Sequence, residues 1–260
     1  MKGRRLRRLW IFDFDGTLSP IVPDRGAAKL HPAARSLLLD LSRQPDDIVA
    51  VLSSRALADL IFRVPVPKVF LGGGSGVEWR FPGGQKIGMT AQGTERAEVA
   101  RRSLIPLLAE CSNVPGVEVE DKYWSVAIHH RKVSPSDMPA FDALRNRLET
   151  ESSARILSGP CVLDIQVLDE VDKSLGVERL CRLLRYDPSR GGILYAGDDD
   201  NDAAAMRWVV ARKGTAISVG GKAKAVGART VSGPAGLARI VRRIAGLADA
   251  RGAPAGSGGP

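Results

Sequence analysis

Two aspartates, Asp13 and Asp15, follow a short run of aliphatic and aromatic residues at positions 9–12. Such a run predicts a buried strand, and Gly16 ends it with a turn. Open α/β sheets bind their ligands at the carboxyl ends of strands, and acidic groups buried there need a cation or hydrogen bonds. A plain strand running into an Asp-Gly turn would explain Asp15 but not Asp13. The pair therefore predicts a chemical site.

A second acidic cluster follows another apolar run at positions 192–196 and carries four carboxylates: Asp198, Asp199, Asp200 and Asp202. Carboxylates this close repel one another unless a divalent cation lies among them. We interpret Asp200 as a solvated residue of the turn that caps the next helix. For Asp198 and Asp202 we favour metal binding, because Asp13 already supplies an acidic strand end. Mg²⁺ suits such a site, since it takes hard oxygen ligands and is usually shared with a substrate phosphate.

A phosphate site also needs donors, and Ser53 and Lys173 could supply them. Ser53 follows an apolar run at 47–52 and offers a hydroxyl beside a helix start, while Lys173 begins a predicted helix with a compact positive charge. Taken alone, Ser53 reads as a helix N-cap and Lys173 as a surface lysine. Both residues lie between the two acidic clusters along the chain, and this order favours a role as phosphate ligands.

The elements that must position these residues alternate between strands and helices, which predicts βα units and a parallel sheet. Between about residues 83 and 165 the pattern changes to two amphipathic helices and several short strands. We therefore predict an α/β fold, a Rossmann-like parallel-sheet core interrupted by an inserted α+β cap domain. The predicted core covers 1–82 and 166–248, the cap 83–165, and a disordered tail 249–260.

Composition narrows the class of protein. The chain has 260 residues, 44% of them hydrophobic, and no apolar stretch long enough to span a bilayer. The apolar run after the basic N-terminus is too short for a signal peptide, so we expect a cytoplasmic protein. The three cysteines and three histidines show no metal-binding spacing, which favours buried thiols. A net charge of +9 could indicate nucleic-acid binding, but scattered arginines with few aromatics favour a solvated surface that attracts anionic substrates.

The motif order resembles the haloacid-dehalogenase-like phosphotransferases and, among them, the trehalose-6-phosphate phosphatase family. The resemblance covers about residues 10–245. The residues that carry it are Asp13–Leu18, Ser53–Arg55, Gly76–Glu78, Val119–Lys122 with Ser125, His129–Arg131, Asp164, Asp172–Lys173 and Gly197–Asp202.

This resemblance implies a haloacid-dehalogenase core and a role for each matched residue. Asp13 is the implied nucleophile that forms an aspartyl-phosphate, and Asp15 the implied general acid and base. Mg²⁺ is expected on the Asp13 carboxylate, the Asp15 carbonyl and Asp198, with Asp199 or Asp202 in close support. Ser53 and Lys173 would hold the phosphate oxygens.

In the cap, the resemblance implies that Glu120, Lys122 and Asp164 contact sugar hydroxyls. Glu120 and Lys122 could instead belong to a solvated strand face. Asp164 stands where the family usually has a glutamate, so its carboxylate is shorter by about one methylene. That departure leaves a related disaccharide or pseudo-disaccharide phosphate open as the substrate. Ser54 and Ser174 also replace glycines that the family usually has.

The leading hypothesis is a Mg²⁺-dependent phosphatase that acts on trehalose 6-phosphate, with a small sugar phosphate as its partner and no membrane partner. We expect a monomer. A phosphatase of another sugar phosphate, or a phosphomutase of the same superfamily, is the alternative among enzymes. From a different class, a basic nucleic-acid-binding protein could retain the fold. It would have no need to keep Asp13, Asp15, Lys173 and Asp198 together.

Overall fold

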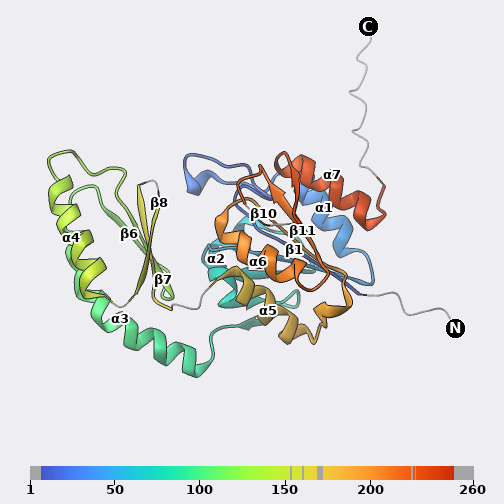
Figure 1. The fold of residues 1–260 in the computed structure, drawn as a ribbon, viewed down its shortest axis with the longest axis horizontal. Coiled ribbons are helices and arrows are strands. Elements are labelled where there is room, and N and C mark those ends of the chain that lie inside the picture. The colour runs from blue at the N-terminus through green and yellow to red at the C-terminus, as the bar shows by residue number, and fades with distance from the viewer. Residues whose placement is uncertain are drawn as a thin grey trace, which may run out of the picture. The chain divides into compact units, whose positions relative to one another are not determined.

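The computed structural model describes residues 7–152, 154–159, 161–168, 172–223, 225 and 227–248, and Figure 1 shows its ribbon. The chain divides into two compact units. The first unit comprises Met1–Val51, Arg63–Val69 and Asp187–Pro260, and the second comprises Leu52–Phe62 and Phe70–Tyr186. These bounds differ from the predicted core and cap, whose division stays a prediction. The predicted disordered tail lies outside the described residues.

The first unit is built on a parallel sheet in the order β12-β11-β10-β1-β2. Its central strands are buried along nearly their whole length, which requires cover on both faces. The bounds of its strands are β1 Arg8–Phe12, β2 Asp47–Leu52, β10 Ile193–Gly197, β11 Thr215–Val219 and β12 Arg229–Val231. The predicted α/β class with a parallel sheet is confirmed.

Three helices pack in this first unit: α1 (Pro32–Ser42), α6 (Asp200–Val210) and α7 (Gly233–Ala245). Helices α1 and α7 lie side by side, while α6 packs on β10 and β11 (Figure 1). Helix α6 begins at Asp200 because the Asp199 side chain caps it by accepting the N–H of Asn201.

The second unit contains a three-stranded antiparallel set, β3 (Val69–Gly73), β4 (Glu78–Arg80) and β5 (Lys86–Ile87). Strand β3 ends in two glycines, Gly72 and Gly73. The Trp79 ring lies directly over Gly72, where an added Cβ would come within 2.7 Å of the ring, so glycine is needed for this pairing. Strands β4, β5 and β12 escape prediction because two or three residues make no apolar run.

The rest of this unit is a four-stranded antiparallel sheet with two helices, α3 (Ala91–Ser112) and α4 (Met138–Glu151). Its strand order is β6-β7-β9-β8, with the bounds β6 Glu118–Asp121, β7 Ser125–His129, β8 Arg155–Gly159 and β9 Val162–Gln166. Helices α2 (Leu57–Arg63) and α5 (Lys173–Leu184) complete the main elements.

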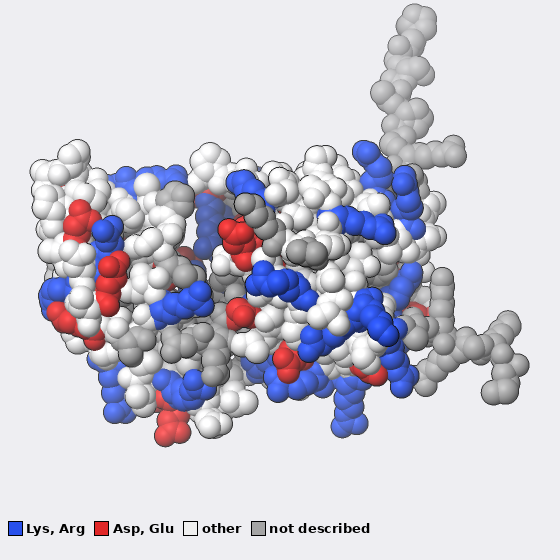
Figure 2. Space-filling model, viewed as in Figure 1, with Lys and Arg blue, Asp and Glu red and all other residues white. Residues whose placement is uncertain are grey.

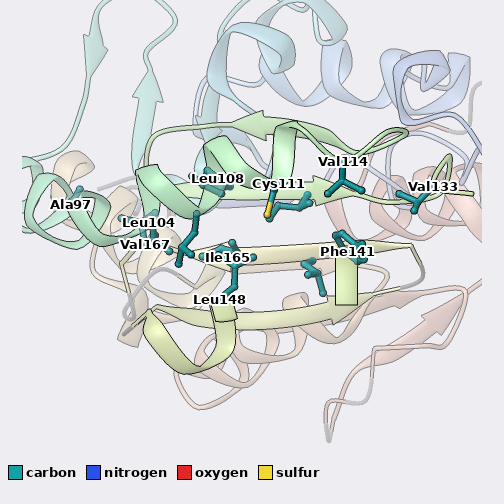
Figure 3. Close-up of a cluster of buried hydrophobic side chains, with 14 residues drawn as sticks. Ala97, Leu104, Leu108, Cys111, Val114, Val133, Phe141, Leu148, Ile165 and Val167 are labelled. Atoms are coloured by element: carbon teal, nitrogen blue, oxygen red, sulfur yellow. The ribbon is translucent and has the colours of Figure 1, made fainter. Parts of the chain in front are cut away.

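One face of the four-stranded sheet is covered by α3 and α4 through a buried apolar cluster (Figure 3). Leu104 and Cys111 from α3 and Phe141 from α4 meet Ile128 and Ile165 from the sheet. Because side chains alternate along strands, the residues between these apolar ones lie on the opposite face. That face carries the residues predicted to contact a sugar.

The helices and the cysteines bear on two further predictions. None of the helices in the described part of the chain combines the length and apolar character that crossing a lipid bilayer requires. Cys111 and Cys181 are buried free thiols as expected, but Cys161 is exposed. Cys161 lies at the turn between β8 and β9 with a φ of 59°, and a turn at the end of a hairpin is open to solvent.

Candidate functional site

Asp13 lies at the carboxyl end of β1, beside the neighbouring strand β10. Its backbone N–H donates to the carbonyl of Ala196 at 2.8 Å, and only 3% of the residue is exposed. Asp13, Asp198 and Asp202 each offer one carboxylate oxygen, and these oxygens lie within 4.8 Å of one another. Oxygens on opposite sides of a bound Mg²⁺ are about 4.2 Å apart. The three residues therefore fit a hard divalent cation after a small movement.

Asp202 also holds the loop that carries Asp198. One of its oxygens accepts the Tyr195 hydroxyl at 2.6 Å. The other accepts the backbone N–H groups of Asp198 and Asp199 at 3.0 and 3.2 Å. Burial and the nearby Asp202 carboxylate raise the pKa of Tyr195 well above its usual value, so the hydroxyl stays protonated and donates.

The turn that carries Asp15 lies against the Asp198 carboxylate. Phe14 accepts the N–H groups of Leu18 and Ser19, and Gly16 has a φ of +76°. A Cβ on Gly16 would lie 2.1 Å from Asp198 Oδ2. Only glycine allows both this backbone conformation and this approach. Asp15 itself is half-buried, so the fold brings the second aspartate of the motif beside the acidic cluster.

Two other predicted acids occupy the same loop with different surroundings. Asp199 is the N-cap of α6 and is half-buried, and it does not join the group of three among the described residues. Its role in supporting a metal stays a prediction. Asp200 is exposed in the first turn of α6, as expected of a solvated residue. The helix-capping acid is thus Asp199 rather than Asp200.

The two predicted phosphate ligands, Ser53 and Lys173, both belong to the second unit and are buried. The backbone N–H of Ser53 donates to Gly72, and its carbonyl accepts the N–H of Ser75 at 2.8 Å. Lys173 is the first residue of α5, where the Asp172 side chain accepts the N–H groups of Ser174 and Leu175. The backbone at each of the two positions is therefore held by hydrogen bonds.

A glycine contact joins these two phosphate ligands through one turn. A Cβ on Gly176 would lie 2.3 Å from the carbonyl oxygen of Ser75, so α5 approaches the 74–76 turn as closely as backbones can. Because Ser75 is also hydrogen-bonded to Ser53, this turn connects Ser53 with the first turn of α5. The acidic residues lie in the other unit, and a joint active site is part of the function proposed below.

The three predicted sugar contacts share one face of the four-stranded sheet. The register pairs Glu120 with Ala127 and Ala127 with Asp164, which places the two carboxylates in one row across the strands. Lys122 Nζ lies 3.6 Å from Glu120, and His129 Nε2 lies 3.5 Å from the same carboxylate. This face therefore presents charged donors and acceptors side by side.

The turn that carries Lys122 is braced from α3 by Arg101, a contact that the sequence analysis missed. Arg101 Nη1 donates to Asp121 Oδ1 at 2.8 Å and to the Tyr123 carbonyl at 2.9 Å. Tyr123 has a φ of 72°, which is unfavourable for a side chain of this size. Hydrogen bonding to Arg101 lowers the pKa of Asp121, so the brace keeps its charge. Nothing in the sequence distinguishes Arg101 from the other arginines of that helix.

Trp124, in the same turn, was also missed. It is 8% exposed, and its ring lies against Gly74, where a Cβ would come within 2.2 Å of the indole. Its buried indole N–H has no acceptor among the described residues. In the sequence, Trp124 is indistinguishable from an ordinary core residue of a strand.

Comparison with known proteins gives a consistent picture. The family model described as trehalose-phosphatase matches residues 11–239. A trehalose-phosphate phosphatase of Mycobacterium tuberculosis is 32% identical over 207 residues, covering 75% of this chain and 49% of its own. The chain thus spans about half the length of the curated relatives it matches.

Solved structures show the same fold. The crystal structure of a trehalose-6-phosphate phosphatase related protein aligns with a TM-score of 0.69 at 19% identity, over 91% of this chain and 96% of that one. A haloacid dehalogenase-like hydrolase from Bacteroides thetaiotaomicron aligns with a TM-score of 0.64 at 15% identity, over 91% and 99% of the two chains. The predicted haloacid-dehalogenase fold is confirmed.

Proposed function

Because the chain belongs to the trehalose-phosphatase family, we propose that it hydrolyses trehalose 6-phosphate to trehalose and phosphate. The observation that carries this proposal is the buried group of Asp13, Asp198 and Asp202 at the carboxyl ends of β1 and β10. The family name and the names of the relatives support the substrate. The proposal also takes residues 1–82 and 166–248 as a catalytic core and 83–165 as its cap.

In the proposed mechanism, Asp13 is the nucleophile. One of its carboxylate oxygens attacks phosphorus, the bond from phosphorus to the sugar oxygen breaks, and an aspartyl-phosphate forms. Asp15 gives a proton to the departing sugar oxygen. Water then attacks the same phosphorus and gives a proton to Asp15, the bond between Asp13 and phosphorus breaks, and inorganic phosphate is released. The contact between Gly16 and Asp198 supports this division of roles, because it brings the Asp15 turn to the acidic cluster.

Phosphate binding and charge neutralisation fall to other residues. Mg²⁺ would be held by Asp13, Asp198 and the Asp15 carbonyl, and it supplies positive charge that stabilises the phosphoryl group in transfer. Asp202 would orient Asp198 through the bonds to the loop backbone. Ser53 and Lys173 would hold the phosphate oxygens, and the backbone contacts of the 74–76 turn with Ser53 and with α5 support this joint role.

The sugar would be recognised by the charged face of the four-stranded sheet. Glu120, Lys122 and Asp164 can accept and donate charge-assisted hydrogen bonds to hydroxyl groups. The common row of Glu120 and Asp164 across the strands, with Lys122 Nζ 3.6 Å from Glu120, supports a single binding surface. The short side chain of Asp164 favours one alternative, a related disaccharide phosphate whose hydroxyl reaches further toward the sheet.

The surface charge is compatible with an anionic substrate. On the face shown in Figure 2, Lys and Arg cover more of the surface than Asp and Glu, in keeping with the net charge of +9. Long-range attraction of this sign raises the rate at which phosphate esters arrive. The proposal takes the protein to be a cytoplasmic monomer that acts on a small sugar phosphate rather than on nucleic acid.

The decisive experiment measures phosphate release from trehalose 6-phosphate, sucrose 6-phosphate and glucose 6-phosphate, with and without Mg²⁺. We expect trehalose 6-phosphate to be preferred, and Asp13→Asn to lower kcat by about a thousandfold or more. Asp200→Asn is the matched control, because this exposed carboxylate lies in the same loop and should leave kcat unchanged. Preference for another disaccharide phosphate would change the proposed substrate and leave the proposed mechanism as it is. Full activity in Asp13→Asn, or salt-sensitive nucleic-acid binding without phosphatase activity, would overturn the proposal.

A further inference from the structure

A separate pocket with a cavity volume of about 300 Å³ lies within the second unit. Its walls come from the 75–77 turn, from the start of α3 with the residues before it, and from Leu168, Asp172 and the part of α5 that reaches Arg182. The segments that lead into α3 and into α5 therefore both line it, and Figure 1 shows these two helices in the lower part of the view. None of the residues assigned above to catalysis or sugar binding lines the pocket.

Three arginines line this pocket: Arg96, Arg179 and Arg182. Arg179 has a structural task, since its guanidinium donates to the carbonyls of Gly76, Val77 and Gly88. It thus ties α5 to the segment that leads into α3. A guanidinium has five N–H donors. Three are used in this way, which leaves two of the Arg179 donors without an acceptor among the described residues.

Among the described residues that line the pocket, Arg179 and Arg182 have no carboxylate partner. Burial and the nearby charge of Arg182 lower the pKa of Arg179, which means that the two guanidinium groups repel each other. Asp172 is the only acidic residue in the lining, and its carboxylate is already occupied by the backbone at the start of α5. In the described part of the chain, neither Arg179 nor Arg182 forms an ion pair.

The remaining walls are largely apolar. Met89, Leu168 and Leu175 also line the pocket, and Leu175 keeps 39% of its surface exposed. A pocket of this volume is at the lower end of the range that holds small ligands. Paired guanidinium groups bind phosphate and carboxylate groups strongly, because both oxygens of the anion can accept hydrogen bonds at once.

We propose that this pocket binds a small organic anion, with its phosphate or carboxylate group on Arg179 and Arg182 and its body against Leu168 and Leu175. The bound anion relieves the repulsion between the two arginines. It also bridges the segment held by Arg179 at Gly88 and the segment that follows β9.

Isothermal titration calorimetry on the full chain, freed of divalent metal with a chelating resin, tests the proposal with two probes, citrate and glycerol 3-phosphate. Without divalent metal, the acidic cluster cannot assist phosphate binding. We expect at least one probe to bind with a dissociation constant below about 10 mM, and Arg182→Glu to weaken it at least about tenfold. Leu175→Trp, which narrows the pocket, should also weaken it. Arg102→Glu is the matched control, because this exposed arginine on α3 does not line the pocket.

The outcomes separate this site from the proposed active site. Binding that persists in Lys173→Met and falls in Arg182→Glu supports the pocket, and the probe that binds identifies the anionic group it selects. Absence of binding by both probes would overturn the proposal. A loss of probe binding in Lys173→Met, or a loss in Arg102→Glu equal to that in Arg182→Glu, would also overturn the proposal. None of these measurements requires phosphatase activity, so the proposed function can fail without affecting them.

Discussion

The hydroxyl of Tyr195 donates a 2.6 Å hydrogen bond to Asp202, and both residues are fully buried. Tyr195 belongs to β10, while Asp202 lies in the first turn of α6. The bond therefore ties the strand to the helix across the loop that contains Asp198. Because the other Asp202 oxygen holds the backbone of that loop, one carboxylate fixes the position of a predicted metal ligand from two sides.

Removal of the Tyr195 hydroxyl tests the contribution of its hydrogen bond to Asp202. Tyr195→Phe leaves a buried carboxylate oxygen without its donor, which should lower the free energy of unfolding by about 1–3 kcal/mol. Urea denaturation measures the change. The control is Tyr123→Phe, whose hydroxyl makes only a long bond of 3.4 Å to the exposed Glu98 and should change stability little. Equal effects in the two variants would argue against a special role for Tyr195.

Substitution of Gly16 tests the approach of the Asp15 turn to Asp198. In Gly16→Ala, the new methyl group would displace the Asp198 carboxylate, and we expect the Mg²⁺ concentration for half-maximal activity to rise about tenfold or more. Gly220→Ala separates this clash from backbone strain, because Gly220 has a φ of +73° but no atom within 4 Å of an added Cβ. It should lower stability and leave the Mg²⁺ requirement as it is. If the Mg²⁺ concentration for half-maximal activity rises equally in both variants, backbone strain alone explains the effect.

Loss of the Arg101 brace should act on substrate binding. Arg101→Leu frees the turn that carries Lys122, so the lysine must be ordered when the substrate binds. We expect KM to rise about tenfold, with a smaller change in kcat. Arg147→Leu is the control, since Arg147 pairs with Glu110 and Glu151 and makes no bond to the turn. Steady-state kinetics with trehalose 6-phosphate measures both constants. A fall in kcat without a rise in KM would contradict this role of Arg101.

The stability of the second unit should depend on pH through His130. Its ring stacks on Phe141 with centroids 4.6 Å apart, and burial, followed by the charge of Arg145, lowers its pKa. The folded state thus favours the neutral ring. The stabilisation is present above the unfolded pKa of about 6.5 and is lost as the pH falls through the lower folded value.

Urea midpoints at about pH 7.5 and about pH 5.5 measure this dependence. Wild-type protein should lose more stability between the two than His130→Gln, which has no group to protonate at this position. If the two proteins lose the same amount, the pH dependence arises from other groups.

Local sequence predicts the ends of strands well and the partners of buried polar groups poorly. Asp13 and Asp198 each follow a buried apolar run, so their places at strand ends could be foreseen. Their proximity depends on the pairing of β1 with β10, which joins residues far apart in the chain. No local pattern encodes that pairing, and only the resemblance to a known family supplied it.

Tyr195 and Arg101 show why other site residues escaped prediction. Tyr195 stands in the middle of an apolar strand, where an aromatic residue is ordinarily core. Arg101 lies on a helix rich in charged residues, so its partners are visible only when the helix is packed on the sheet. In both cases the function of the polar group depends on a contact between separate elements. Such contacts are properties of packing rather than of sequence pattern.

The glycine contact between α5 and the 74–76 turn has a consequence for the energetics of catalysis. In the proposed mechanism, the close backbone contact limits movement of α5, so the backbones at Lys173 and Ser53 keep their spacing before the substrate binds. A pair that is ordered in advance loses little conformational entropy when it takes up phosphate. Free energy of binding that would otherwise be spent on ordering the two ligands is then available to stabilise the transition state.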